Sequence, residues 1–424
     1  MNKRVLIITY YWPPAGGPGV QRWLKFVTYL REFEIDPVVF IPESPSYPIV
    51  DYSMINEVPE DIKVLKQPIF EPYSLAKLLS KKKTSQISSG IIQDKKQSLV
   101  ERFMLFVRGN FFIPDARKYW VKPSVKFLSG YLQENKINTI ITTGPPHSVH
   151  LIGLELKKLL TIKWIADFRD PWTTIGYHNQ LKLTSQSQKK HKKLESEVLN
   201  SADEVIVTSF QTKEEFQSIS KKPITIITNG YEDNEETDKV LDTKFSISHV
   251  GSLLTARNPL VLWQVVKELI EEDKGFAEDV SIQLAGKVSE TVIKSIEDHG
   301  LEHCVNLMGY VSHEEARTIQ VKSQVLLLVE IDSVETKGII AGKLFEYLAA
   351  KRPLLAIGPQ NADIATIIEQ TQSGYFYSPV QKQELKNTIV SLYNQFKNGS
   401  LTCQSVNIEQ YHRRNLTAKL AELL

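Results

Sequence analysis

Short runs of apolar residues alternate along the chain with longer amphipathic stretches. An apolar run of four to eight residues is typical of a buried strand, and apolar residues repeating every three or four positions are typical of a helix. The first half of the chain has such runs at 5–9, 37–41, 137–148, 163–172 and 203–208, and the second half at 245–250, 280–287, 305–311, 325–330 and 353–358. Amphipathic stretches separate most of these runs, which predicts alternating strands and helices.

This alternation predicts an α/β fold with two Rossmann-like domains facing each other across a deep cleft. The acidic stretch from Glu232 to Asp238 interrupts the pattern and is typical of an exposed linker. We therefore place a first domain at 1–231 and a second at 240–405. The amphipathic C-terminal helix, within 406–424, is expected to pack back on the first domain.

The most informative stretch is 336–358, where a glycine-bearing turn precedes a helix from about Ile340 to Ala350 and a buried strand. The apolar face of this helix should pack against a sheet, which leaves Lys343 and Glu346 on the other face. Their spacing allows an ordinary surface ion pair. The alternative is a ligand site, because a helix start after a flexible glycine presents free N–H groups suited to phosphate.

Polar side chains follow two predicted strands of the first half. His147 follows one strand, and Asp167, Arg169 and Asp170 end the next. Since ligands bind outside the carboxyl ends of parallel strands, these four residues are expected to share one crevice. The structural alternatives are a helix-start role for His147 and a capping role for Asp170.

Two loops between a strand and a helix carry glycines. The first contains Gly16 and Gly17 but lacks the spacing G-x-G-x-x-G, which argues against a dehydrogenase and leaves a tight turn or a phosphate or sugar contact. The second runs from Gly251 to Asn258 and places Arg257 at a helix start. We expect Arg257 to face the same crevice.

Composition narrows the classes of protein. A net charge of +2 argues against a dedicated nucleic-acid binder. The two cysteines, Cys304 and Cys403, form neither a disulfide framework nor a metal-ligand spacing, which fits a reducing cytoplasm. No apolar run reaches the ~18 residues of a membrane span. We expect a cytoplasmic protein without a metal or cofactor.

The stretch 99–120 is rich in Phe, Leu and Val and is punctuated by basic residues, including Arg102, Arg108 and Lys118. Most such segments are core helices with a basic outer face. The alternative is an interfacial helix on an anionic membrane, with the run Lys81 to Lys83 as a second electrostatic contact.

Taken together, these motifs resemble the GT-B glycosyltransferases of the large retaining family 4, common in bacterial surface-polysaccharide synthesis. The resemblance covers nearly the whole chain and is strongest in VGSLLTARNP, LAGK, NLMGYVSHEEA and GKLFEYLAAKRPLLAIG. It implies transfer of a sugar from a nucleotide diphosphate sugar to a saccharide or lipid-linked acceptor, in cell-surface polysaccharide or glycolipid biosynthesis.

The resemblance also implies roles for individual residues. Glu346 would hold the ribose hydroxyls of the donor, and Arg257 would neutralise its diphosphate. Tyr310 and Val311 would border the base, and Gly16 with Gly17 would lie beside the donor phosphates. The remaining residues implied for the donor site are Ser252, Gly286, Gly338, Ile339, Ile340, Ala341 and Lys343.

The chain departs from the family pattern in three places. Gly338 stands where the family has the first of two glutamates eight residues apart, and Glu335 or Lys337 is a candidate substitute. Ser252 replaces the arginine that usually follows the glycine of the G-x-L loop. Arg169 stands where a histidine often ends the strand, while His147 lies on the neighbouring loop.

The proposed chemistry needs cations and N–H dipoles at a leaving diphosphate. Arg257, Lys343 and the helix start suit this role, with Asp167, Asp170 or His147 orienting the acceptor hydroxyl. Two alternatives remain open: a nucleotide-sugar 2-epimerase of the same fold and a non-catalytic sugar-nucleotide-binding protein. A metal-dependent transferase of the other common fold does not suit the two-domain layout.

Overall fold

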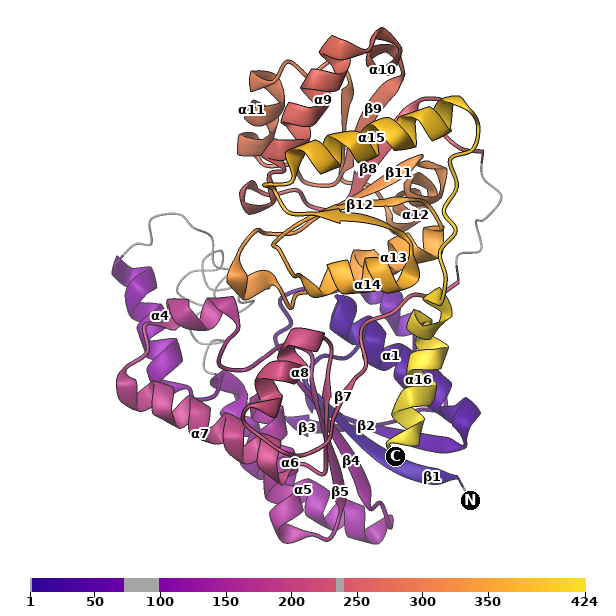
Figure 1. Ribbon diagram of the computed structural model, residues 1–424. Helices are drawn as coiled ribbons and strands as arrows, with labels where there is room; N and C mark the ends of the chain where they lie inside the picture. Colours follow the sequence, from indigo (N-terminus) through magenta and orange to yellow (C-terminus); the bar gives the residue numbers. More distant parts are fainter. Residues whose placement is uncertain (1, 72–98, 234–239) are drawn as a thin grey trace. The chain divides into compact units, whose positions relative to one another are not determined.

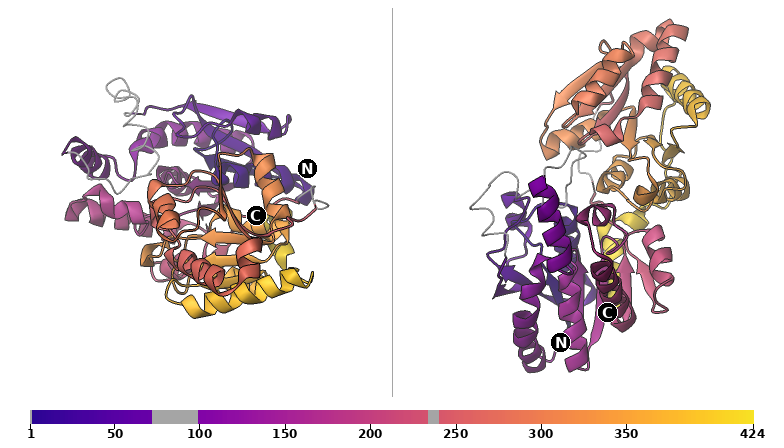
Figure 2. Two further views of the ribbon diagram at one scale, coloured as in Figure 1. Left: turned by 90° about the horizontal axis from the view of Figure 1, so that it is seen from above. Right: turned by 90° about the vertical axis from the view of Figure 1, so that its left-hand side faces the viewer.

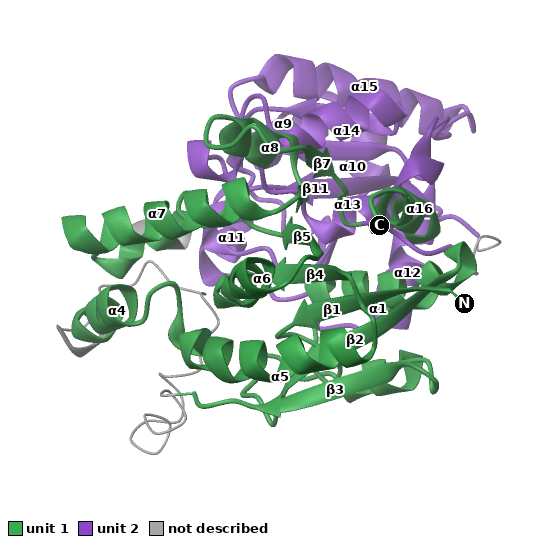
Figure 3. Ribbon diagram, turned by 90° about the horizontal axis from the view of Figure 1, so that it is seen from below, with its two compact units in different colours: residues 1–229, 413–424 green, residues 230–412 purple. Residues whose placement is uncertain are grey.

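The computed structural model describes residues 2–71, 99–233 and 240–424, which fold into two compact units (Figures 1 and 3). The first unit comprises residues 1–229 and 413–424, and the second comprises 230–412. The chain thus rejoins the first unit at Arg413 rather than at residue 406. The lysine run at 81–83 and most of the acidic linker lie outside the described residues.

The first unit is built on a parallel sheet of seven strands in the order β3-β2-β1-β4-β5-β6-β7. The strands are β1 (Lys3–Thr9), β2 (Ile35–Glu43), β3 (Lys63–Pro68), β4 (Thr139–Gly144), β5 (Lys163–Phe168), β6 (Glu204–Val207) and β7 (Ile224–Ile226). Its helices are α1 (Pro18–Leu30), α4 (Leu99–Phe111), α5 (Val121–Glu134), α6 (Ser148–Leu159), α7 (Ser185–Ser201), α8 (Phe210–Gln217) and α16 (Arg413–Glu422).

Continuous apolar strands are required here because helices cover both faces of this sheet. Leu6 and Ile8 of β1 enter a core that includes residues of α5 and α6. Val5 and Ile7 enter a core on the other face, which includes residues of α1 and α16. Figure 1 shows α1 and α16 lying side by side. The C-terminal helix is thus part of the first unit's core.

The second unit has a six-stranded parallel sheet in the order β10-β9-β8-β11-β12-β13. The strands are β8 (Phe245–Val250), β9 (Val280–Ala285), β10 (Val305–Gly309), β11 (Val325–Val329), β12 (Leu354–Ile357) and β13 (Gly374–Tyr377). The helices are α9 (Leu260–Glu272), α10 (Lys274–Asp279), α11 (Glu290–Asp298), α12 (His313–Lys322), α13 (Gly342–Ala350), α14 (Asp363–Thr371) and α15 (Lys382–Lys397).

Strand order reverses once in each sheet, between β1 and β4 in the first unit and between β8 and β11 in the second. Ligands of open α/β sheets bind where this reversal leaves a crevice at the carboxyl ends of the strands. The loops that follow these four strands are therefore the expected sites of binding in each unit.

The main helix of interest begins later than its sequence pattern predicts. Ala341 is extended, with φ −62° and ψ 135°, and caps a helix that starts at Gly342 instead of Ile340. The N–H group of Ile339 is already used, because it donates to the carbonyl oxygen of Thr336. Gly338 to Ala341 therefore form a loop before the helix.

Candidate functional site

The crevice of the second unit is organised around a contact between two glycines. Gly251 follows β8 and Gly286 follows β9, with φ angles of 121° and 131° that favour glycine. A Cβ atom on Gly286 would lie 2.5 Å from the carbonyl oxygen of Gly251. Glycine is therefore required for the two loops to meet. One on Gly251 would lie 2.4 Å from Lys343 Nζ, so the ammonium group reaches over this turn.

Lys343, in the first turn of α13, is held by a buried histidine. Its Nζ lies 3.4 Å from Nε2 of His249, the next-to-last residue of β8. Nδ1 of His249 lies 3.0 Å from the carbonyl oxygen of Leu327, which can only accept a hydrogen bond. Nδ1 is thus the protonated nitrogen of the ring, and Nε2 is free to accept from Lys343.

A second cation, Arg257, is held by a carboxylate at the end of β11. An Nη atom of Arg257 lies 3.2 Å from Oε2 of Glu330, whose side chain is only 3% exposed. Arg257 itself is 29% exposed. It lies in a short 3₁₀ turn, Thr255–Arg257, before α9. The ion pair therefore links the segments that follow β8 and β11, the two strands between which the strand order reverses.

Burial and repulsion between like charges shift the pKa values of the ionisable groups in this cluster. Burial, reinforced by the positive charge of Arg257, lowers the pKa of Lys343 from 10.5 to about 8. Burial raises the pKa of Glu330 although Arg257 opposes the change. Burial, followed by the charge of Lys343, lowers the pKa of His249 to about 3, so this ring is neutral. An anionic ligand would relieve the repulsion between the two cations.

The other polar residues of α13 have separate partners. Oε2 of Glu346 accepts a hydrogen bond of 3.0 Å from the Gln320 side chain of α12. The Tyr347 hydroxyl accepts one of 2.9 Å from the backbone N–H of Val250, just before the Gly251 turn. Lys343 and Glu346 therefore contact different partners, in contrast to the simple surface ion pair that their spacing allowed.

A cavity of about 700 Å³ opens beside the Gly251 turn. Four residues implied by the family resemblance line it together: Ser252, Gly286, Tyr310 and Val311. Tyr310 is 96% exposed, so its ring is free to cover a ligand. The cavity adjoins the Lys343 ammonium group through Gly251. Its volume lies in the range of small-molecule sites.

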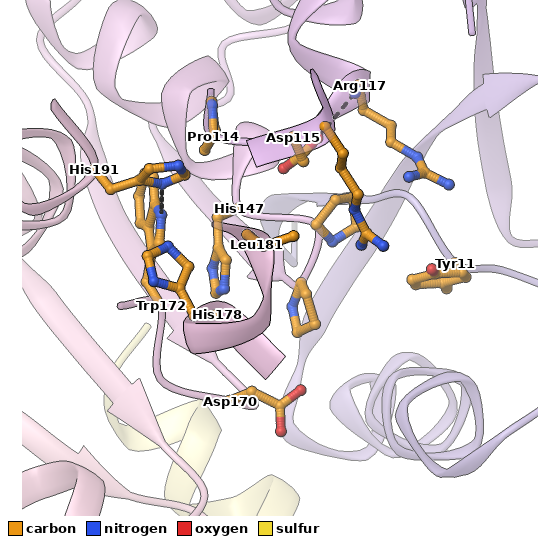
Figure 4. Close-up of a pocket in the computed structure, with 13 residues that line it drawn as sticks. Tyr11, Pro114, Asp115, Arg117, His147, Asp170, Trp172, His178, Leu181 and His191 are labelled. Atoms are coloured by element: carbon orange, nitrogen blue, oxygen red, sulfur yellow. Dashed lines mark hydrogen bonds between the residues drawn. The ribbon is translucent and has the colours of Figure 1, made fainter. Parts of the chain in front are cut away.

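The first unit holds a smaller cavity, of about 170 Å³, at the carboxyl ends of β4 and β5 (Figure 4). The loops after β1, β4 and β5 and the segments around 108–117 and 178–191 all contribute to it. Its lining residues are Tyr11, Arg108, Pro114, Asp115, Arg117, Pro145, Pro146, His147, Asp170, Trp172, His178, Leu181 and His191.

His147 lines this cavity with both ring nitrogens unused. The side chain is 5% exposed, and neither nitrogen has a hydrogen-bond partner among the described residues. Its ring stacks on Trp172 with a centroid distance of 4.9 Å and an interplanar angle of 2°. Burial, and then the neighbouring His150, lowers its pKa well below 6.5. A neutral imidazole offers one donor and one acceptor to a hydroxyl group.

Asp170 lines the same cavity, but Asp167 and Arg169 do not. The Asp167 side chain is fully buried and accepts hydrogen bonds from Arg22, Trp23 and Thr143. Arg169 Nε donates to the carbonyl oxygen of Gly144 over 3.2 Å. Two of the four expected residues are thus brought together, and the other two hold the surrounding loops.

The glycine loop of the first unit is ordered by the backbone. Gly16 N–H donates to the carbonyl oxygen of Ile49 over 3.1 Å, and Gly17 precedes α1 as its N-cap residue. Neither lines the histidine cavity. Their expected contact with the donor phosphates stays a prediction.

Several residues of these sites were missed in the sequence. His249 lies inside a buried strand and gave no signal, and Gln320 lies in an ordinary amphipathic helix. Glu330 does follow the rule that marked Asp167, because it ends the apolar run VLLLV. His178 and His191 are distant in sequence from His147, and only the fold brings them to its cavity.

Two features are absent from the described residues. No group of three or more His, Cys, Asp or Glu side chains there could hold a metal ion. No helix in that part of the chain is both long and apolar enough to cross a membrane.

The two parallel-sheet α/β units match the Rossmann-like domains of proteins with the GT-B glycosyltransferase fold. HepE of Anabaena, whose structure contains UDP, superposes with a TM-score of 0.62 at 12% identity over 99% of each chain. A glycosyltransferase of Rickettsia africae gives a TM-score of 0.61 at 12% identity, covering 100% of this chain and 97% of the other. Sucrose-phosphate synthase of Thermosynechococcus elongatus gives 0.58 at 14% identity, covering 99% and 98%.

At the level of sequence, residues 244–395 match the family model described as Glycosyl transferases group 1. The second unit therefore carries a glycosyltransferase domain, and the matched segment includes the Gly251 turn, Arg257, Lys343 and Glu346. No curated protein matches the chain by sequence.

Proposed function

We propose that the protein transfers a sugar from a nucleotide diphosphate sugar to a saccharide or lipid-linked saccharide, with retention at the anomeric carbon. One observation carries this proposal: two cations, Lys343 and Arg257, stand at the point of strand reversal. Lys343 reaches over Gly251, which lines a cavity of about 700 Å³. Both cations lie in the segment that matches the glycosyltransferase model. The reaction is proposed to belong to cell-surface polysaccharide or glycolipid biosynthesis, at the cytoplasmic face of the membrane.

The donor is proposed to span this site with its diphosphate at the cations. Lys343 and Arg257 neutralise the phosphates, together with the N–H groups that begin α13 at Gly342. The cavity between Ser252 and Tyr310 takes the nucleoside. Glu346 accepts hydrogen bonds from the ribose hydroxyls. In support, the structure of HepE includes a complex with UDP and glucose.

The bond to the anomeric carbon breaks as negative charge grows on the leaving diphosphate. Fixed cations stabilise that charge most when they are already in place, and His249 and Glu330 hold them there. In a retaining reaction on the donor's front face, the leaving phosphate accepts the proton of the acceptor hydroxyl. No protein nucleophile, metal or cofactor is then needed. His147 and Asp170 are proposed to orient the acceptor.

The donor site is tested by turnover of Arg257→Ala and Glu346→Ala with nucleotide sugars and an acceptor. We expect Arg257→Ala to lower kcat/KM by about 100-fold, because it removes a charge aligned with the leaving group. Glu346→Ala should mainly raise the KM for the donor. Lys294→Ala and Glu297→Ala, both exposed on α11, are matched controls. Near wild-type kinetics in both site variants would exclude this donor site.

The same assay separates the transferase from its two alternatives. An epimerase isomerises the nucleotide sugar without any acceptor, whereas a transferase releases the nucleoside diphosphate only when an acceptor is present. A binding protein is stabilised by the nucleoside diphosphate in a thermal-shift measurement and releases none with any acceptor. Uridine, guanosine and adenosine diphosphates would identify the base.

A further inference from the structure

The sugar of the proposed donor has a defined side of the second unit. Under the proposed function, the nucleoside occupies the cavity lined from the ends of β8, β9 and β10, and the diphosphate lies at Lys343 and Arg257. A nucleoside and a sugar occupy opposite ends of the diphosphate that joins them. Because Arg257 pairs with Glu330 at the end of β11, the sugar is expected on the far side of the cations, over the loop between β11 and α13.

Most polar side chains of this loop, residues 331–341, form hydrogen bonds within the loop itself. The Thr336 hydroxyl lies 2.5 Å from the carbonyl oxygen of Ile331 and 3.0 Å from that of Ser333. The exposed Glu335 carboxylate accepts hydrogen bonds from its own N–H and from the Ser333 hydroxyl, which lower its pKa. The hydroxyl and carboxylate groups in the middle of the loop are therefore already engaged.

The end of the loop, residues 338–341, offers backbone donors instead of polar side chains. The N–H of Ile339 donates to the carbonyl oxygen of Thr336 over 2.9 Å, whereas the N–H groups of Ile340 and Ala341 donate to no described residue. The side chain of Ile339 is 44% exposed. Free N–H donors thus lie next to an exposed aliphatic side chain.

The nearby carboxylates leave limited capacity for the hydroxyl groups of a sugar. Glu330 is paired with Arg257 at 3.2 Å, and Glu346 accepts from Gln320 at 3.0 Å and is assigned to the ribose. Asp332 is exposed and bonds to no described residue, so it can accept from a sugar hydroxyl. The end of the loop, by contrast, suits a substituent that is not a hydroxyl group.

An acetamido group matches both features of residues 338–341. Its carbonyl oxygen accepts hydrogen bonds from N–H donors, and its methyl group gains free energy by contact with an aliphatic side chain. A hydroxyl group is too short to make both contacts. Because residues 338–341 directly precede Gly342, where the diphosphate meets the start of α13, they are nearest to carbon 2 of the sugar, next to the anomeric carbon.

We propose that the donor is a nucleotide diphosphate sugar with an acetamido group on carbon 2, and that the end of this loop selects it. The carbonyl oxygen of the acetamido group accepts from the N–H groups of Ile340 and Ala341, and its methyl group packs on Ile339. Asp332 accepts from a hydroxyl group of the same sugar. This specificity rests on the proposed function, because it requires the diphosphate to lie at the two cations.

The specificity is tested by calorimetric titration of the full-length protein with two matched pairs of donors. The pairs are UDP-N-acetylglucosamine with UDP-glucose, and UDP-N-acetylgalactosamine with UDP-galactose. We expect the acetylated member of at least one pair to bind at least about tenfold more tightly, the discrimination that one added apolar group gives in a fitted site. Equal affinities within both pairs would overturn the specificity.

Uridine diphosphate alone reports the donor site separately. If it binds while the paired sugars do not differ, the specificity is wrong and the donor site stands. If uridine, guanosine and adenosine diphosphates all fail to bind, the donor site is excluded and the specificity with it. Should guanosine or adenosine diphosphate bind instead of uridine diphosphate, the matched pairs are prepared on that nucleotide and the same criterion applies.

Substitution of Ile339 tests the contact with the methyl group. Ile339→Asn should lower the affinity for the acetylated donor about tenfold and leave the affinities for its unacetylated partner and for uridine diphosphate unchanged. Ile339→Val keeps an aliphatic side chain and should retain most of the preference.

The matched control is Val390→Asn, which changes an aliphatic side chain that is 37% exposed on α15. This helix lies along α9, where Lys382 and Lys386 pair with Glu268 (Figure 2). The control should bind every donor as the wild type does. Unchanged melting temperatures show that the variants are folded. Full preference in Ile339→Asn, or an equal loss for both members of a pair, would overturn the selection by Ile339.

Discussion

Each unit contains a buried carboxylate at the end of a strand, paired with an arginine, and the two pairs differ in one respect. Asp167 lies 3.2 Å from Arg22, and Glu330 lies 3.2 Å from Arg257. Arg22 is 3% exposed, whereas Arg257 is 29% exposed. The first pair is enclosed in the core, and the second stands at the edge of a crevice.

Additional hydrogen bonds explain the difference. Asp167 also accepts from the Trp23 indole at 2.9 Å and from the Thr143 hydroxyl at 2.7 Å, so its lone pairs are engaged. The pKa of Glu330 is raised by burial, which indicates a carboxylate with less compensation. A carboxylate at a strand end therefore has a structural role when buried neighbours fill its hydrogen-bonding capacity. It can belong to a ligand site when the arginine paired with it remains accessible to solvent.

The contrast between the two ion pairs would be wrong if Asp167 could be replaced without loss of stability. We expect Asp167→Asn to lower the free energy of unfolding by about 3–5 kcal/mol, because it leaves the Arg22 charge buried without its counter-ion. Glu330→Gln should change stability much less, since Arg257 can turn toward solvent. Chemical denaturation followed by fluorescence would measure both. Similar losses in the two variants would contradict the distinction.

A smaller effect, on catalysis, is expected when Lys343 of the second unit is replaced. Lys343→Met should lower kcat/KM for the nucleotide sugar by about 100-fold, because it removes a preorganised charge at the diphosphate. Lys294→Met, on the exposed face of α11, is the control. Melting temperatures should stay close to wild type, since an apolar chain replaces a lysine that is already partly buried. Full activity in Lys343→Met would show that Arg257 alone suffices.

The pH dependence of donor binding tests whether Lys343 binds the diphosphate. The protonated ammonium of Lys343 attracts the diphosphate, and its pKa is about 8. Below that pH the charge is present, and above it the KM for the donor should rise, by up to about tenfold per pH unit. Lys343→Arg should remove this rise, because guanidinium keeps its proton throughout. Identical pH profiles for the two proteins would assign the titration to another group.

The smallest effect is expected when Gln320, which donates a hydrogen bond to Glu346, is replaced. Gln320→Leu removes the hydrogen bond that orients the carboxylate and should raise the KM for the donor about fivefold, with kcat little changed. Gln283→Leu, which loses a comparable bond to Asp242 in the same unit, is the control. A fall in kcat without a change in KM would show that Glu346 acts on the reacting sugar instead of the ribose.

The sequence by itself determined the alternation of strands and helices, the two units, and the position of Lys343 and Glu346 on the polar face of one helix. These features depend on local periodicity, which neighbouring residues specify. It also placed His147 and Asp170 at strand ends, where the structure brings them to one cavity.

Only the tertiary structure decided which polar groups are already satisfied. Nothing near Asp167 in sequence indicates that Arg22 and Trp23 enclose it, and nothing near Lys343 indicates His249, 94 residues away. The helix likewise starts at Gly342 because the backbone of Ala341 is extended. Hydrogen bonding between distant segments depends on strand order and packing, and these are properties of the whole fold.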